Sequence, residues 1–378
     1  ASGPRAVVAS GVAAAHARDI LLESGLWERL PFYQVVQPYP LHTAFIARLL
    51  DAYEEILVLE ETEAVIEMQL LDRRRVRGRM TGAVPETGEL HPEIVERVLA
   101  EFAGLPARTD APPGKDRGRR PTLCAGCPHR SSFYAIKLAA PRGIYPSDIG
   151  CYTLGLNLGG VDTVLCMGAA ISQASGFYQA HRLAGKQVDI VATIGDSTFY
   201  HAGVPPLIDA VVQGARFVLV ILDNATTAMT GYQATPATGV GAAGETTGVV
   251  DMESLVRGCG VGFCKVGTPS DLPEFVALLK EAVAFSRAHG PAVVIAREPC
   301  GMDRRQAALF PTRRKVRVNE ECDGCRHCTE QFECPALVYD DGGQRVFVDT
   351  LLCNGCGVCL HVCPRGAIAE EDPGEGNR

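Results

Sequence analysis

Eight cysteines near the C-terminal end of the chain occur in two runs with a repeated spacing. In each run two residues separate the first three cysteines, and a Cys-Pro pair follows after five residues in the first run and three in the second. The second spacing is that of cysteine runs that bind a pair of [4Fe–4S] clusters, in which each fourth cysteine ligates the other cluster. We therefore expect one cluster on Cys322, Cys325, Cys328 and Cys363, and a second on Cys353, Cys356, Cys359 and Cys334.

The alternative for these cysteines is a pair of zinc sites. Zinc ribbons place two C-x2-C pairs about 12–20 residues apart and use neither a third cysteine in each run nor a trailing Cys-Pro. Iron–sulfur ligation fits the spacing better. The segment 318–368 resembles a two-cluster ferredoxin domain, which implies the transfer of single electrons.

A second set of polar residues follows two apolar stretches in the middle of the chain. Gly195, Asp196 and Ser197 end one stretch, and Asp223 and Asn224 end the next. Carboxylate and amide oxygens suit Mg²⁺, and a glycine before a helix lets backbone amides approach a diphosphate. Ligands of open parallel sheets bind at the carboxyl ends of strands, so we expect a magnesium–diphosphate site here. The alternative is an ordinary strand–helix turn.

The seven cysteines outside the tail divide by their surroundings. Four lie in glycine- or proline-bearing turns, where free backbone amides can donate to cluster sulfides: Cys124, Cys127, Cys151 and Cys300. Three have apolar or small neighbours and are predicted to be packing residues: Cys166, Cys259 and Cys264. For the first four, the alternative is buried structural thiols.

The stretches around these residues resemble the 2-oxoacid:ferredoxin oxidoreductases, and the α subunits of the indolepyruvate type in particular. The resemblance is carried by CAGCPHRSSFYAIK, SDIGCYTLG, GDSTFYHAG and LDNATTAMTGYQ, and it covers nearly the whole chain. The thiamine diphosphate signature of such enzymes begins Gly-Asp-Gly and ends in a pair of asparagines. This sequence departs from it at Ser197 and at Asp223.

The resemblance implies the cofactor contacts residue by residue. Mg²⁺ would be held by Asp196, Asn224 and the backbone carbonyl of Thr226. The diphosphate would lie against Gly195, Ser197, Thr230 and Gly231. Met167 would support the bent cofactor, with a core methionine as the alternative, and the four loop cysteines would bind a third [4Fe–4S] cluster beside the thiamine.

The activity that the resemblance implies is the oxidative decarboxylation of 2-oxo acids, aryl pyruvates such as indolepyruvate, to acyl-CoA and CO₂. Thiamine diphosphate would serve as the electron sink, and three [4Fe–4S] clusters would pass electrons to ferredoxin. His129 and Arg130 would meet the substrate carboxylate or satisfy the cluster loop. A β- or γ-type subunit is implied as a partner. The pyrimidine-binding domain and its activating glutamate are expected on another chain or segment, because nothing in this sequence precedes its first α/β domain.

Two other functions stay open. A non-catalytic iron–sulfur electron-transfer subunit is motivated by the departures at Ser197 and Asp223. A relative could instead act on aliphatic 2-oxo acids or pass electrons to NAD through a flavoprotein. No GxGxxG fingerprint follows a predicted strand, so a nicotinamide would have to bind elsewhere.

The elements expected to position these residues alternate between strand and helix, which predicts parallel sheets covered on both faces. Strands are expected at 5–11, 32–38 and 55–61, and then at 163–166, 189–194, 216–222 and 292–296. The predicted domains are a transketolase C-terminal-like α/β domain (1–105), a linker (106–121), a thiamine-binding α/β domain (122–310), a ferredoxin domain (311–368) and a tail (369–378). In the first domain, Glu60, Glu61, Glu63 and Glu67 form an acidic strand–helix junction predicted to be structural.

The composition of the chain excludes several classes of protein. With 47% hydrophobic and 21% charged residues among 378, the chain is typical of globular proteins rather than disordered ones. Its 36 basic and 44 acidic residues give a net charge of −8, which provides no reason to expect nucleic acid or an anionic membrane as a partner. No apolar run reaches the roughly 18 residues that span a bilayer, and no signal pattern is present, so a cytoplasmic protein is expected.

Overall fold

The computed structural model describes residues 4–72, 74–106, 120–309 and 314–371. The chain divides into two compact units, Ala1–Gly118 and Arg119–Arg378, which are described one at a time. The predicted linker 106–121 and tail 369–378 lie largely outside the described residues.

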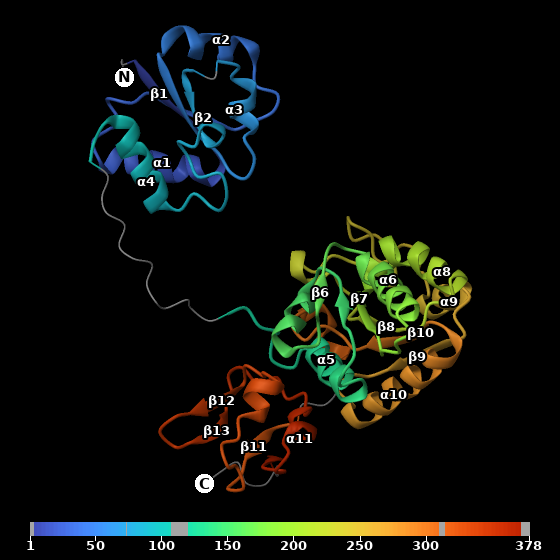
Figure 1. The fold of residues 1–378 in the computed structure, drawn as a ribbon. Coiled ribbons are helices and arrows are strands. Elements are labelled where there is room, and N and C mark those ends of the chain that lie inside the picture. The colour runs from blue at the N-terminus through green and yellow to red at the C-terminus, as the bar shows by residue number, and fades with distance from the viewer. Residues whose placement is uncertain (1–3, 73, 107–119, 310–313, 372–378) are drawn as a thin grey trace. The chain divides into compact units, whose positions relative to one another are not determined.

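The first unit is a parallel four-stranded sheet in the order β2-β1-β3-β4. Its strands are β1 (Arg5–Ser10), β2 (Phe32–Val35), β3 (Glu55–Leu59) and β4 (Val76–Arg77). Its α-helices are α1 (Gly11–Glu23), α2 (Thr43–Ala52), α3 (Val65–Gln69) and α4 (Pro92–Ala103), with a 3₁₀ turn at Arg79–Thr81. Successive residues of β1 face opposite sides, so that Val7 packs in the core under α1 and α4 while Val8 packs in the core under α2 and α3 (Figure 1).

The second unit contains a six-stranded parallel sheet in the order β6-β5-β7-β8-β10-β9. Its strands are β5 (Pro146–Ser147), β6 (Thr163–Val164), β7 (Val191–Gly195), β8 (Val218–Asp223), β9 (Phe263–Gly267) and β10 (Ala292–Arg297). Its helices are α5 (Pro128–Ala139), α6 (Ala169–Leu183), α7 (Asp196–Thr198), α8 (Val204–Val212), α9 (Met252–Gly258) and α10 (Leu272–His289). Shorter helical turns occupy Cys151–Leu158, Phe199–Gly203, Ala228–Thr230 and Arg304–Leu309.

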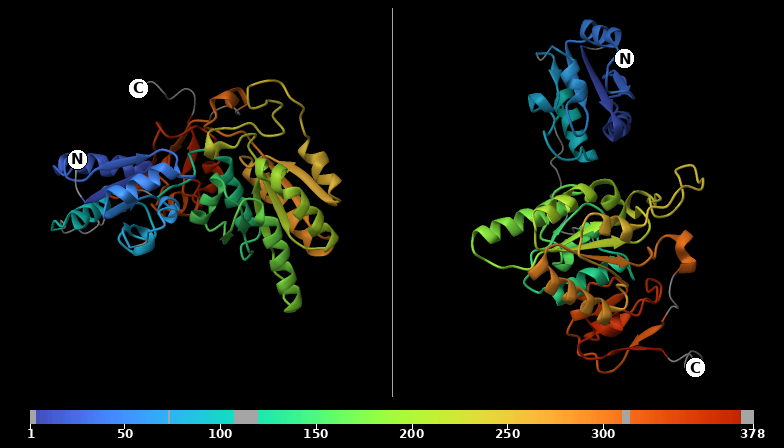
Figure 2. Two further views of the ribbon diagram at one scale, coloured as in Figure 1. Left: turned by 90° about the horizontal axis from the view of Figure 1, so that it is seen from above. Right: turned by 90° about the vertical axis from the view of Figure 1, so that its right-hand side faces the viewer.

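Helices cover both faces of this sheet, as the alternation predicts (Figure 2). Val220 of β8 packs toward α5 and α10, whereas its neighbour Ile221 packs toward α6 and α8. The central strands β7 and β8 pair in parallel, with Gly195 opposite Leu222. Their carboxyl ends therefore lie side by side at one edge of the sheet, which is where the predicted magnesium ligands follow.

Within the second unit, the cysteine-rich tail forms two small antiparallel ribbons that pack against the sheet domain. The ribbons pair β11 (Val316–Val318) with β14 (Ile368–Glu370), and β12 (Leu337–Asp340) with β13 (Arg345–Val348). A π-helical turn (His327–Gln331) and α11 (Cys359–Val362) complete it. Tyr134 of α5 joins the tail to the sheet domain through a 2.9 Å hydrogen bond between its hydroxyl and His327 Nε2, and its ring lies 5.4 Å from that of Phe332. The predicted combination of two α/β sheets with a ferredoxin-like tail is confirmed.

Some details differ from the sequence predictions. The sequence analysis missed the short strands β4 and β5 and the strand β9. Cys264 within β9 and Cys259 just before it are nonetheless buried as predicted, with 4% and 7% of their surfaces exposed. Cys166 is exposed instead of packed, because β6 is a two-residue edge strand and the chain leaves the sheet before reaching it. Within the described ranges, every helix is too short or too polar to cross a bilayer.

Candidate functional site

A cavity lies at the carboxyl ends of β7 and β8 and gathers most of the predicted cofactor residues. Its lining includes Gly195, Asp196, Ser197, Asn224, Thr226 and Met167, together with His129 and Cys151. Met167 has 56% of its surface exposed, so the alternative of a core methionine is wrong. Thr230 and Gly231 do not line the cavity: the Thr230 hydroxyl donates instead to Gln233 Oε1, at 2.6 Å, in an exposed turn.

Asp196 is the buried carboxylate of this cavity. Only 3% of its surface is exposed, and its Oδ1 accepts a 2.6 Å hydrogen bond from the Ser197 backbone amide. Its Oδ2 is buried without a hydrogen-bond partner, and burial, helped by Asp223, raises the pKa of this carboxyl to about 7. A buried oxygen left without a partner is costly unless a cation or donor meets it. The residues present therefore fit a bound Mg²⁺.

Asn224 is oriented from both ends of its side-chain amide. Its Oδ1 accepts from the Thr226 backbone amide at 3.2 Å, and its Nδ2 lies 3.3 Å from His129 Nε2. Burial lowers the pKa of His129 to about 4, so the ring is neutral at pH 7, and Nε2 can accept the amide proton. His129 therefore holds the carboxamide in one orientation, which leaves the second lone pair of Oδ1 for a metal ion.

Asp223 takes no part in the cavity lining. Its Oδ2 pairs with Arg297 Nε of β10 at 2.8 Å, and Arg297 also contacts Glu253 at 3.2 Å. The aspartate that departs from the family signature thus forms an ion pair between neighbouring strands.

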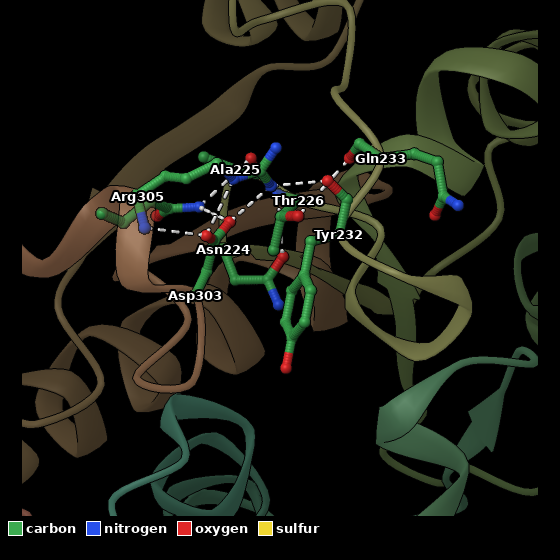
Figure 3. A network of polar contacts seen from close by, with 8 residues as sticks. Asn224, Ala225, Thr226, Tyr232, Gln233, Asp303 and Arg305 are labelled. Carbon is green, nitrogen blue, oxygen red and sulfur yellow. Dashed lines mark hydrogen bonds and ion pairs between the residues drawn. The ribbon is translucent and has the colours of Figure 1, made fainter. Parts of the chain in front are cut away.

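The turn that carries Asn224 is held by the segment that follows Cys300 (Figure 3). Ala225 and Tyr232 both have positive φ angles, 57° and 63°, in the left-handed region that non-glycine residues rarely adopt. The Arg305 guanidinium donates to the Tyr232 carbonyl, and Arg305 is fixed in turn by Asp303, with 2.9 Å between Nε and Oδ1. Gln306 donates to the Ala225 carbonyl at 3.4 Å. We call these contacts of Arg305 and Gln306 with the Asn224 turn the clamp. No sequence pattern predicted them.

The four loop cysteines lie close to one another beside this cavity. Burial raises the pKa of Cys151, and the neighbouring Cys300 and Cys124 raise it further. The pKa of Cys127 rises to about 12, also mainly through burial. Such thiols stay protonated unless a metal centre binds them, because the thiolate is the form that ligates.

The eight tail cysteines form two groups, each around a small cavity of its own. One cavity is lined by Cys322, Cys325, Cys328 and Cys363, and the other by Cys334, Cys353, Cys356 and Cys359. These are the crossed sets expected from the spacing. Among the described residues, no three His, Cys, Asp or Glu side chains converge on a point where one metal ion could lie. Cysteines around a cubane cluster each bind a different iron atom, which requires wider separation.

The crossed pairing can be tested by single substitutions. We expect Cys334→Ser to give the same electron paramagnetic resonance (EPR) spectrum as Cys353→Ser, and Cys363→Ser to match Cys322→Ser. Each variant should fall from about 12 to about 8 iron atoms per chain, because each cluster holds four. Cys166→Ser is the control and should keep all its iron, since Cys166 belongs to neither group. A Cys334→Ser spectrum that matches Cys322→Ser would show local rather than crossed pairing.

Arg130 turns away from the cavity, which corrects its interpretation as a substrate-binding residue. Only 1% of its surface is exposed. Its Nη1 donates to the carbonyls of Phe332, at 2.9 Å, and Glu333, and its Nη2 donates to the carbonyl of Leu123. The guanidinium is therefore committed to backbone atoms of two cysteine-bearing loops.

The acidic junction of the first unit is structural, as predicted. Glu60 accepts hydrogen bonds from the Ile66 and Glu67 amides at 2.7 and 2.9 Å, and so caps α3. Glu67 accepts from the Met80 amide at 2.9 Å. Both carboxylates bind backbone groups of their own unit.

Comparisons with known proteins agree with this geometry. Residues 148–296 match the C-terminal TPP binding domain of thiamine pyrophosphate enzymes, and residues 346–369 match the 4Fe-4S binding domain. The indolepyruvate oxidoreductase subunit IorA of Archaeoglobus fulgidus is 39% identical over 386 residues, which cover 97% of this chain and 60% of the relative. The IorA subunit of Pyrococcus horikoshii is 34% identical over 98% of this chain and 61% of its own length.

Solved structures give a weaker match. A 2-oxoglutarate:ferredoxin oxidoreductase from Magnetococcus marinus aligns over 48% of this chain and 66% of its own, with 18% identity and a TM-score of 0.42. The chain spans about 60% of the length of the curated relatives it matches.

Proposed function

We propose that the chain belongs with the indolepyruvate oxidoreductase subunits IorA, to which it is 38–39% identical over 97% of its length, and that it takes part in the oxidative decarboxylation of 2-oxo acids. It contributes the diphosphate side of a thiamine site and three [4Fe–4S] clusters that lead electrons to ferredoxin. The substrates are aryl pyruvates such as indolepyruvate, and the products are acyl-CoA and CO₂. The observation that carries the proposal is the unpartnered Asp196 oxygen in a cavity that Cys151 also lines. A cation site and a cluster ligand then share one wall.

The residues of the cavity have distinct tasks in this proposal. Bound thiamine diphosphate would supply an electron sink for the carbanion left by decarboxylation. Asp196 and Asn224 bind Mg²⁺, and neutral His129 keeps the Asn224 carboxamide turned toward it. Gly195 leaves room for a neighbouring ring, because a Cβ there would lie 2.6 Å from Tyr152 Cε1. Met167 offers an exposed apolar contact on the same wall.

The proposal assigns other tasks to partners. Glu60 accepts backbone amides with both of its oxygens, and Glu67 accepts one with Oε2 while its Oε1 is buried without a partner, so both carboxylates are part of the fold of the first unit. We assign the carboxylate that activates the cofactor to a segment beyond these residues or to another chain, together with the pyrimidine-binding domain. A β- or γ-type subunit completes the substrate pocket, and ferredoxin accepts the electrons.

The test is an assay on the complex purified without oxygen, partners included. Reduction of a viologen dye is followed with indolepyruvate, phenylpyruvate, pyruvate and 2-oxoglutarate, each with and without CoA. We expect CoA-dependent reduction with the two aryl acids. Dye reduction with pyruvate or 2-oxoglutarate, but not with the aryl acids, would show that the substrates are aliphatic 2-oxo acids instead of aryl pyruvates. Absence of reduction in a preparation that keeps about 12 iron atoms per chain would favour an electron-transfer subunit without thiamine chemistry.

A further inference from the structure

A single buried guanidinium joins the 124–127 loop, which carries two of the four cavity-side cysteines, to the tail. Arg130 donates to the carbonyls of Leu123 and Glu333. Each of these residues immediately precedes a cysteine of a different set, Cys124 and Cys334. One side chain therefore fixes the spacing between the two predicted cluster-binding loops.

The same two loops also touch directly. The second tail cavity, lined by Cys334 and its set, is walled on one side by Ala125 and Gly126. Gly126 has a φ of 63°, and a Cβ there would lie 2.0 Å from the Asn354 side chain. The cavity around Cys322 has no wall from the 124–127 loop. The set containing Cys334 is therefore the tail set adjacent to the cavity-side cysteines.

The positive charge of Arg130 has no carboxylate partner among the described residues. Its acceptors are neutral carbonyls, and its Nε is buried with no acceptor at all. The nearby Glu333 carboxylate pairs with Arg120 instead. A buried cation is costly unless an anion compensates it. Burial lowers the pKa of Arg130, whereas the nearby anionic groups raise it: the cysteine sulfurs of the two sets, Cys334, Cys127 and Cys124, and the Glu333 carboxylate that already pairs with Arg120.

We propose that Arg130 is a positioning residue for electron transfer: a fixed buried cation between two iron–sulfur clusters that stabilises the reduced state of each. The inference rests on the proposed function, in that both cysteine sets hold [4Fe–4S] clusters. Each transfer oxidises the cavity-side cluster by one electron and reduces the adjacent tail cluster by one, with ferredoxin as the final acceptor. Because reduction adds negative charge to a cluster, a nearby cation raises its reduction potential. Arg130 would thus keep the reduction potentials of both clusters high enough for the same electron donor to reduce them.

The test compares Arg130→Gln with Arg130→Lys in the complex purified without oxygen. Redox titrations followed by EPR give the midpoint potentials without 2-oxo acid or thiamine. We expect Arg130→Gln to lower the ratio of reduced to oxidised cluster about tenfold at a fixed potential for both clusters, which is about 59 mV for a one-electron couple. Arg130→Lys keeps the charge and should stay near the wild-type ratio. Arg182→Gln removes an exposed arginine of α6 that lines neither tail cavity, and it should change neither cluster.

The comparison of the two variants distinguishes an effect of the Arg130 charge from an effect of its packing and hydrogen bonds. Equal shifts in the glutamine and lysine variants, or wild-type potentials in both, would overturn the inference. If the glutamine variant does not retain iron, the lysine variant alone decides, because a tenfold change there would show that the hydrogen bonds and not the charge matter. A wild-type complex without [4Fe–4S] signals would instead refute the proposed function on which the inference rests.

Discussion

Replacing Asp196 by asparagine is expected to weaken the binding of thiamine diphosphate with Mg²⁺ at least about 100-fold. The substitution keeps the shape of the side chain but removes the charge of the buried oxygen that has no other partner. About 2.7 kcal/mol corresponds to this change, which lies within the range lost with one charge-assisted contact in a buried site. Titration calorimetry on the purified complex measures the affinity, and iron content shows that the clusters are intact.

Asp209→Asn provides the matched control for this experiment. Asp209 lies exposed on α8 and contacts Gln213, away from the cavity lining. It should bind the cofactor as the wild type does. Wild-type affinity in Asp196→Asn would show that the Asp196 carboxylate is not a magnesium ligand.

The same substitution should also change how the cofactor-free protein responds to pH. The pKa of Asp196 is raised to about 7 in the folded chain, above the roughly 3.9 of an unfolded aspartate. The folded state therefore binds more protons than the unfolded state between these values, and its stability falls as the pH rises through this window. We expect the melting temperature of the wild type to fall more between pH 5 and 7.5 than that of Asp196→Asn.

Spacing and strand patterns predicted those parts of the site that depend on local sequence. The crossed tail sets followed from the cysteine spacing, because three thiols separated by two residues each can surround only one cavity. Asp196 and Asn224 were found because the carboxyl ends of adjacent parallel strands meet at one edge. Both inferences use geometry that a short segment sets by itself.

Roles that depend on distant contacts could not be assigned from the sequence. For His129 and Arg130 two roles stayed open, binding of the substrate carboxylate and support of the cluster loop, and Arg130 takes the second. Both residues lie in the first turn of α5, where successive side chains point about 100° apart, so one faces the cavity and the other the tail. The Arg305 contact with Tyr232 joins positions 73 residues apart, and neither residue has a local pattern that announces it. Such pairings are set by tertiary packing and need the structure.

The contacts of Arg305 and Gln306 that hold the Asn224 turn lead to the second large prediction. We expect Arg305→Met to weaken thiamine diphosphate binding about 10- to 100-fold while the iron content stays unchanged. Left-handed non-glycine residues cost roughly 1–3 kcal/mol each and persist only where the surroundings hold them. Losing the arginine bond to the Tyr232 carbonyl removes such a support, and a bond from a charged donor is worth about 1.5–3 kcal/mol. In the variant, part of the binding free energy of thiamine diphosphate would be used to order the Asn224 turn, which lowers the affinity.

Two further variants show whether strain is the cause. Arg304→Met is the matched control, because Arg304 is exposed and the hydrogen bonds to the Asn224 turn from this segment come from Arg305 and Gln306 instead. Adding Tyr232→Gly to Arg305→Met should restore part of the lost affinity, since glycine adopts the 63° φ angle of this position without steric cost. Equal losses in the Arg304 and Arg305 variants would rule out the clamp. A double variant no better than Arg305→Met alone would show that the arginine acts by charge rather than by holding the strained backbone. If the glycine restores affinity, the segment that begins at Cys300 would serve both proposed sites, with Cys300 as the proposed cluster ligand and Arg305 holding the Asn224 turn in its binding conformation.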